Sequence, residues 1–200
     1  MDWTGLAARA GAMIVRPGRT WDVIGPEPGD ARTVLQTYVA PLAAIPAICG
    51  ALGELVFATR IGEVGVREPP LGVLAKAAAG YATTFAVVWL LAWWIAAIAA
   101  PFGGLRERDQ ALKLAAYSGT VLWLAGVAHL YPNLALPVGI LALLYAGWTL
   151  YQGLPRMMRS DPAHNLTYFA AVLLGFLLLA VLRATVVAKA AELGGPLMMG

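Results

Sequence analysis

Charged side chains are scarce in this sequence, and the long stretches without any of them are its most informative property. Only 12% of the 200 residues are Asp, Glu, Lys or Arg, against roughly a quarter in ordinary soluble domains. Residues 114–155 contain none of these four types over 42 positions. A soluble helical hairpin of that length would need a charged outer face. The shortage therefore excludes a water-soluble fold and indicates a membrane protein.

Cysteine and catalytic motifs are lacking as well. The single cysteine, Cys49, excludes an internal disulfide framework and a multi-cysteine zinc site. The sequence has no HExxH, GxSxG or phosphate-loop pattern. Ser118 and His129 would stand roughly 16 Å apart on one helix, too far for a catalytic dyad. We therefore expect no enzyme activity, no metal and no cofactor.

Five apolar segments are each long enough to cross a hydrocarbon core of ~30 Å as a helix. They cover residues 35–57, 77–101, 111–130, 134–154 and 166–188. Because lipid cannot satisfy backbone N–H and C=O groups, we expect these segments to be helices. The predicted fold is an all-α integral membrane bundle of five transmembrane helices.

An amphipathic segment precedes the first span. Its apolar residues fall at helical spacing, with Arg9 and Arg16 off that face: Trp3, Leu6, Ala7, Ala10, Met13 and Ile14. This pattern predicts a short helix lying in the membrane interface, and the alternative is a helix that packs on the bundle. We divide the chain into a cytoplasmic N-terminal segment (1–34), a five-helix membrane domain (35–190) and a short C-terminal tail (191–200).

Positive residues in the short loops predict the orientation of the chain. With the N-terminus inside, nine Lys and Arg residues face the cytoplasm and at most five lie on the other side. Cytoplasmic loops of membrane proteins carry the excess of Lys and Arg. We therefore expect a cytoplasmic N-terminus, an external C-terminus and, for a bacterial protein, insertion in the cytoplasmic (inner) membrane.

Three polar residues lie within or at the ends of the spans, and on this topology all are near the outer face: Glu54, His129 and Arg183. A charge inside a membrane is costly unless it is paired. We therefore predict an ion pair between Glu54 and Arg183, which would join the first and last helices. The alternative is that each side chain extends separately to the headgroups. Ala43, Ala47 and Ala51 repeat at spacing four, which favours close helix packing.

Two regions of the sequence resemble bacterial members of the Yip (Ypt-interacting protein) domain family. Residues 16–24, RPGRTWDVI, are similar to the P-x-x-T-W-x-x-I start of those proteins, and residues 116–118, 130–134, 144–145 and 150–158 resemble their second half. The positions that carry the likeness are Pro17, Trp21, Tyr131, Pro132, Tyr151, Gly153, Leu154 and Pro155. We expect these residues to be architectural, with Gly153 and Pro155 ending the fourth helix.

The resemblance implies five transmembrane helices and a cytoplasmic N-terminus. Eukaryotic relatives are linked to Rab-type small GTPases, but this chain lacks their long N-terminal region and acidic loop signature, so a small GTPase partner is not implied. The net charge of +3 is scattered and does not indicate nucleic acid binding. We expect a non-enzymatic protein that organises membrane lipids, copies of itself or other membrane proteins. The alternative is a channel or transporter component for a small solute.

Overall fold

The computed structural model describes residues 2–57, 59–61, 64–195 and 198–199. Within these residues, five helical segments are long and apolar enough to cross a membrane. They are Ala31–Val56, Pro70–Ile98, Arg108–Leu130, Asn133–Met158 and Pro162–Gly194. The predicted all-α fold with five membrane-spanning helices is confirmed.

Most spans are built from more than one helical element. Two short helices come first, α1 (Trp3–Val15) and α2 (Pro17–Ile24). The spans then consist of α3 (Ala31–Val34), the π-helical turn η1 (Leu35–Val39) and α4 (Ala40–Val56); α5 (Pro70–Ile98) with η2 (Ala100–Phe102); α6 (Arg108–Ser118), α7 (Thr120–Ala125) and η3 (Gly126–Leu130); α8 (Pro132–Met158); and η4 (Pro162–His164), α9 (Asn165–Ala191) and η5 (Glu192–Gly194).

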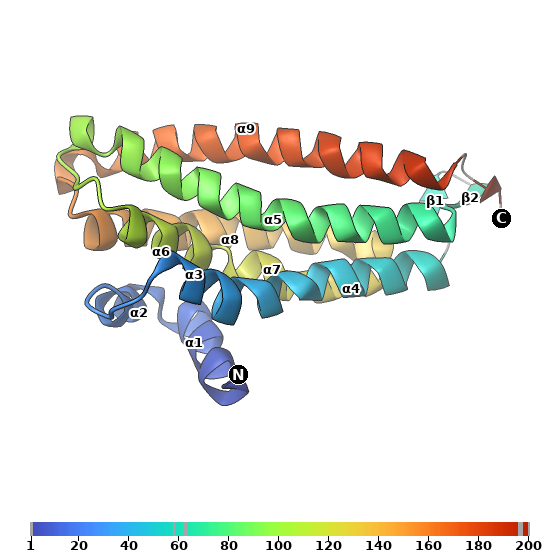
Figure 1. The fold of residues 1–200 in the computed structure, drawn as a ribbon, viewed down its shortest axis with the longest axis horizontal. Coiled ribbons are helices and arrows are strands. Elements are labelled where there is room, and N and C mark those ends of the chain that lie inside the picture. The colour runs from blue at the N-terminus through green and yellow to red at the C-terminus, as the bar shows by residue number, and fades with distance from the viewer. Residues whose placement is uncertain (1, 58, 62–63, 196–197, 200) are drawn as a thin grey trace.

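The long helices run side by side along the longest axis of the molecule (Figure 1). Helix α5 packs on α4, on α6 and most extensively on α9. Helix α2 lies at one end of the bundle, which we call the α2 end, and α1 projects sideways from there (Figure 1). The C-terminus lies at the opposite end, which we call the C-terminal end.

A small antiparallel sheet is present at the C-terminal end and was not expected from the sequence. Strand β1 (Thr59–Ile61) pairs with β2 (Val64–Arg67), and β2 pairs with β3 (Met198–Met199). The described part of the predicted C-terminal tail therefore includes a strand that returns to the connection between α4 and α5.

Two spans begin earlier along the chain than the charge pattern predicts. Helix α5 starts at Pro70 rather than at residue 77, and α6 starts at Arg108 rather than at residue 111. The extension of α6 adds Arg108 and Asp109, and that of α5 includes Lys76, whose charge is paired with Glu54 and Glu68 inside the protein. Because a lysine with such partners can be accommodated in a helix, a charge alone does not mark the helix boundary.

Helix α1 combines the two arrangements considered for it. Ala10 and Met13 are buried against the bundle, as in the packed alternative. Trp3 and Val15 are 62% and 73% exposed, so an apolar edge of the helix remains uncovered. The helix therefore packs on the bundle and also presents apolar side chains to its surroundings.

The buried indole of Trp21 joins α2 to α8. Its Nε1 donates a hydrogen bond to the carbonyl of Thr149, 3.1 Å away, and its ring lies edge-on to Tyr117 with centroids 6.4 Å apart. Gly153 allows this contact, because a Cβ there would lie 2.8 Å from the indole and 2.4 Å from a methyl group of Leu114. The contact closes the core at the α2 end.

The expected end of the fourth helix at Gly153 and Pro155 is wrong. Helix α8 continues to Met158 and ends where Arg159 adopts a left-handed conformation with φ of 50°. A proline within a helix frees the carbonyl four residues earlier, here that of Tyr151. The Asn165 Nδ2 donates to this carbonyl at 3.3 Å. The helix tolerates Pro155 because α9 supplies the missing donor.

We predict that Gly153→Ala lowers the free energy of unfolding by about 1–3 kcal/mol, the usual effect of overpacking. The matched control is Gly139→Ala in the same helix, where an added Cβ meets nothing within 4 Å. Both substitutions change the helix propensity equally, so their difference reports the contact with Trp21. Unfolding midpoints in a mild detergent measure the difference in stability between the two variants. Equal midpoints would contradict this packing.

Candidate functional site

The three polar residues singled out in the spans line one cavity toward the C-terminal end. The cavity has a volume of about 240 Å³ and lies between α4, α5, α9 and η3. Glu54 comes from α4, His129 from η3 and Arg183 from α9. A fourth polar residue, Lys76 of α5, lines it as well.

Small residues on α4 and α5 leave the space for this cavity. Ala47 and Ala51 belong to the strip that was expected to serve helix packing, and both line the cavity opposite Gly80 of α5. Close packing does occur nearby, since a Cβ at Gly53 would lie 2.1 Å from the carbonyl oxygen of His129. The strip therefore forms a wall of the cavity, and the neighbouring Gly53 lets η3 approach α4 closely.

Lys76 holds the acidic groups of this region. Its Nζ lies 2.6 Å from Glu54 Oε2 and 2.8 Å from Glu68 Oε2. Sequence reasoning missed this residue because it placed Lys76 in a loop before the second span. The Pro69-Pro70 pair was the available signal, because proline favours the first position of a helix and would have placed Lys76 inside α5.

Arg183 has a backbone partner rather than an acidic one. Its Nη2 donates to the carbonyl of Gly80 at 3.1 Å, and no ion pair between described residues includes Arg183. The expected direct pair between Glu54 and Arg183 is not formed. Helix α5 packs on both α4 and α9, and its Lys76 forms the ion pair with Glu54 instead.

His129 is fixed by its own turn. Its Nδ1 lies 3.0 Å from the carbonyl oxygen of Gly126, a contact that orients the imidazole within η3. Among the described residues, no group of three or more His, Cys, Asp and Glu side chains is placed to hold a metal ion. The cavity thus offers one guanidinium with unused donors, one carboxylate shared with Lys76, and an imidazole.

The family-like positions are divided between the two ends of the bundle. At the α2 end, the buried Pro17 opens α2, Trp21 packs against Gly153, and Leu154 is buried in the same core. Tyr151 lies edge-on to Phe169 with ring centroids 5.5 Å apart. At the C-terminal end, Tyr131 packs on Phe57 at 5.4 Å, and α8 begins at Pro132. These contacts give the positions a role in joining helices.

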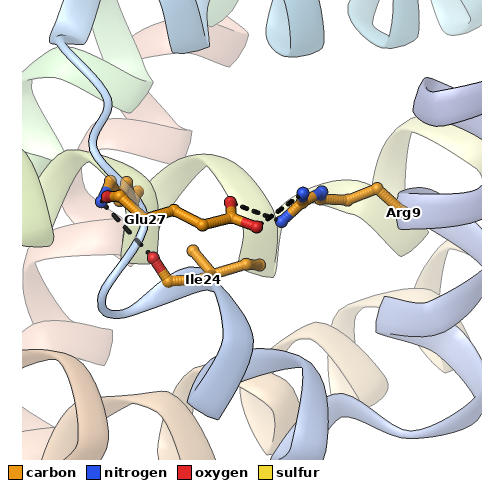
Figure 2. A network of polar contacts seen from close by, with 4 residues as sticks. Arg9, Ile24 and Glu27 are labelled. Atoms are coloured by element: carbon orange, nitrogen blue, oxygen red, sulfur yellow. Dashed lines mark hydrogen bonds and ion pairs between the residues drawn. The ribbon is translucent and has the colours of Figure 1, made fainter.

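A polar network fixes the connection between α2 and α3. Arg9 donates two hydrogen bonds to the carboxylate of Glu27, at 2.7 and 2.8 Å, as Figure 2 shows. This hydrogen bonding raises the pKa of Arg9 above its usual value. The buried Lys113 donates to the carbonyls of Ile24, at 3.4 Å, and Glu27. Lys113 therefore belongs to the protein interior and should not be counted among the loop cations.

The five apolar spans define the chain as a helical integral membrane protein. The family model of the Yip1 domain matches residues 11–184. The chain belongs to the Yip1 domain family, which confirms the resemblance seen in the sequence.

Relatives of known location match almost the whole chain. The inner membrane protein YohC of Escherichia coli K12 is 30% identical over 182 residues, which cover 88% of this chain and 92% of that protein. YohC of Escherichia coli O6:H1 (strain CFT073) matches with the same identity and coverage. No solved structure matches the chain significantly.

We predict that double-mutant cycles distinguish the two possible partners of Glu54. The cycle of Glu54→Gln with Lys76→Gln should give a coupling energy of about 1–2 kcal/mol, between the values for exposed and buried pairs. The cycle of Glu54→Gln with Arg183→Gln should give less than about 0.5 kcal/mol. Unfolding free energies in detergent supply both values, and a larger coupling to Arg183 would contradict the arrangement described above.

Proposed function

We propose that this protein acts non-enzymatically in the inner membrane of a bacterium, where its α1–α2 surface holds anionic lipids. We define the α1–α2 surface as the exposed faces of α1 and α2 together with the turn at Arg16 that joins them. Membership of the Yip1 domain family and the inner membrane relatives support the location. The role itself rests on the charges and shape of this surface.

The arginines of the α1–α2 surface differ in their partners. Arg9 is paired with Glu27, and Arg156 of the adjacent α8 is paired with Asp22 at 3.2 Å. Arg16 and Arg19 are exposed, and no ion pair between described residues includes either of them. The nearby acidic groups are already engaged, so these two cations are available to an anionic ligand. This is the observation that carries the proposal.

The two arginines line two hollows, the first almost entirely apolar and the second with a mixed polar and apolar lining. One, of about 680 Å³, lies between α1 and α2, and the other, of about 600 Å³, reaches Tyr145 and Trp148 of α8. Val15, which is 73% exposed, lines both hollows together with Arg16 and Arg19. Cations beside uncovered apolar surface match an anionic phospholipid, whose phosphate and acyl chains need both.

The distribution of positive charge supports a cytoplasmic location for the α2 end. Arg16, Arg19, Arg32, Arg106, Arg108, Arg156 and Arg159 belong to the segments at this end. The C-terminal end has fewer cations, and two of them, Lys76 and Lys189, are paired with glutamates. Since Lys and Arg mark cytoplasmic loops, we propose that the N-terminus is inside and the C-terminus outside.

We predict that reporters fused to the two termini report different compartments. A fluorescent protein that folds only in the cytoplasm should be active at the N-terminus and dark at the C-terminus, and alkaline phosphatase should give the opposite result. Activity of one reporter at both termini would contradict five crossings of the membrane. Cytoplasmic activity at the C-terminus alone would reverse the orientation.

We predict that Arg16→Gln with Arg19→Gln weakens the retention of phosphatidylglycerol by roughly 30-fold, because each basic residue near the membrane surface contributes about 1 kcal/mol. Native mass spectrometry of protein released from vesicles of defined composition measures the retained lipid. The control, Arg16→Lys with Arg19→Lys, keeps both charges and should retain lipid like the original protein. Unchanged retention in the glutamine variant would refute the proposal.

A further inference from the structure

The cavity at the C-terminal end contains positive and negative groups that are not fully neutralised by direct contacts with one another. Lys76 is bound by two carboxylates, those of Glu54 and Glu68. The three residues together therefore have a net charge of −1. Arg183 adds one positive charge to the cavity, and its described hydrogen bond goes to a backbone carbonyl. The whole set is neutral, with a carboxylate on α4 and a guanidinium on α9.

The free hydrogen-bonding capacity is found on both charged groups. A guanidinium has five N–H donors, and one of those of Arg183 is used by Gly80. An ionised carboxylate has about four acceptor positions, and Glu54 is bound by the ammonium of Lys76. The groups on α4 and α9 can therefore each accept a further partner of opposite charge, one an anion and the other a cation.

The depth of the cavity places it close to the lipid headgroups. Arg183 lies eight residues before the end of α9 at Ala191, which corresponds to about 12 Å along the helix. Helix α9 has 27 residues, about 40 Å, which exceeds a hydrocarbon core of ~30 Å by roughly 5 Å at each end. The Cα of Arg183 is thus about 7 Å inside the boundary, a depth from which an arginine reaches the headgroups.

We infer that this cavity binds a zwitterionic phospholipid headgroup that contains a phosphate and a primary ammonium, as in phosphatidylethanolamine. The phosphate binds Arg183, whose planar guanidinium matches two phosphate oxygens. The ammonium binds the carboxylate of Glu54. A neutral site with separated charges fits a neutral ligand with separated charges, and it disfavours a ligand that has only the anionic part.

This site is independent of the α1–α2 surface, because it lies at the other end of the bundle and selects a different headgroup. The test is therefore made in the Arg16→Gln/Arg19→Gln background, where lipid held by the α1–α2 surface is removed. If the α1–α2 surface does not bind anionic lipid, the lipid preference measured at this cavity can still be interpreted. The protein is reconstituted in nanodiscs with equal amounts of phosphatidylethanolamine and phosphatidylglycerol, and native mass spectrometry counts the lipids retained after release.

We expect phosphatidylethanolamine to be retained over phosphatidylglycerol. Arg183→Gln should reduce retention of phosphatidylethanolamine at least about tenfold, since a hydrogen bond to a charged group is lost. Glu54→Gln should reverse the preference toward phosphatidylglycerol, because the ammonium loses its partner while Arg183 remains. Replacing phosphatidylethanolamine with phosphatidylcholine, whose ammonium has no N–H donors, should also reduce retention.

Two further variants separate binding from stability. Lys189→Gln removes an exposed cation of α9 that does not line the cavity, and it should keep the preference. Ala47→Leu fills the cavity without changing any charge and should abolish retention, which provides a second test if Arg183→Gln does not fold. The proposal is overturned if phosphatidylglycerol is retained as well as phosphatidylethanolamine, or if Ala47→Leu and Arg183→Gln leave retention unchanged.

Soluble ligands distinguish a lipid site from a site for a free metabolite. Glycerophosphoethanolamine and inorganic phosphate are added separately to detergent-solubilised protein, and the unfolding midpoint is measured. Stabilisation by glycerophosphoethanolamine, lost in Arg183→Gln, shows that the headgroup alone is recognised. Stabilisation only by the intact lipid shows that the acyl chains are needed as well. Stabilisation by inorganic phosphate equal to that by glycerophosphoethanolamine contradicts the role of Glu54.

Discussion

The burial of Trp21 against α8 is the interaction on which the α2 end of the molecule depends. The indole links α2 to the carbonyl of Thr149 in α8, and Thr20 beside it donates to the carbonyl of Ala12 in α1, at 3.0 Å. Helix α1 is therefore joined to α2, in addition to its direct packing on the bundle. The positions of Arg16, which joins these two helices, and of Arg19, within α2, follow from this anchoring. Gly153 is required because no other residue type leaves room for the indole.

The same kind of contact recurs between the membrane-spanning helices. Trp94 of α5 donates to the carbonyl of Ala171 in α9 at 3.0 Å, and Tyr168 of α9 donates to the carbonyl of Ile95 in α5 at 2.7 Å. Hydrophobic burial provides little attraction between helices in lipid, so packing and interhelical hydrogen bonds determine which helices meet. Aromatic donors suit this task because they combine a large apolar surface with one N–H or O–H group.

The sequence was sufficient to predict the spans but not their neighbours. Apolar runs with at most one charged residue each locate five helices, because the cost of burying an unpaired charge is a local property of the chain. The start of α5 was not predicted, because Lys76 is paired with Glu54 of another helix, and that partner is not evident from the sequence. The partner of Glu54 was missed for the same reason: nothing in one sequence says that α5 packs on both α4 and α9.

The two ends of the bundle balance their charges in different ways. At the α2 end, paired arginines such as Arg9 lie beside Arg16 and Arg19, which form no ion pair within the described part of the chain, so the surface has a net positive charge. At the C-terminal end, Arg183 shares a cavity with Glu54 and Lys76, and the set is neutral once Glu68 is included. A net positive surface attracts any anionic lipid and is screened by salt. A neutral site selects by the arrangement of charges instead, so the two ends differ in selectivity as well as in affinity.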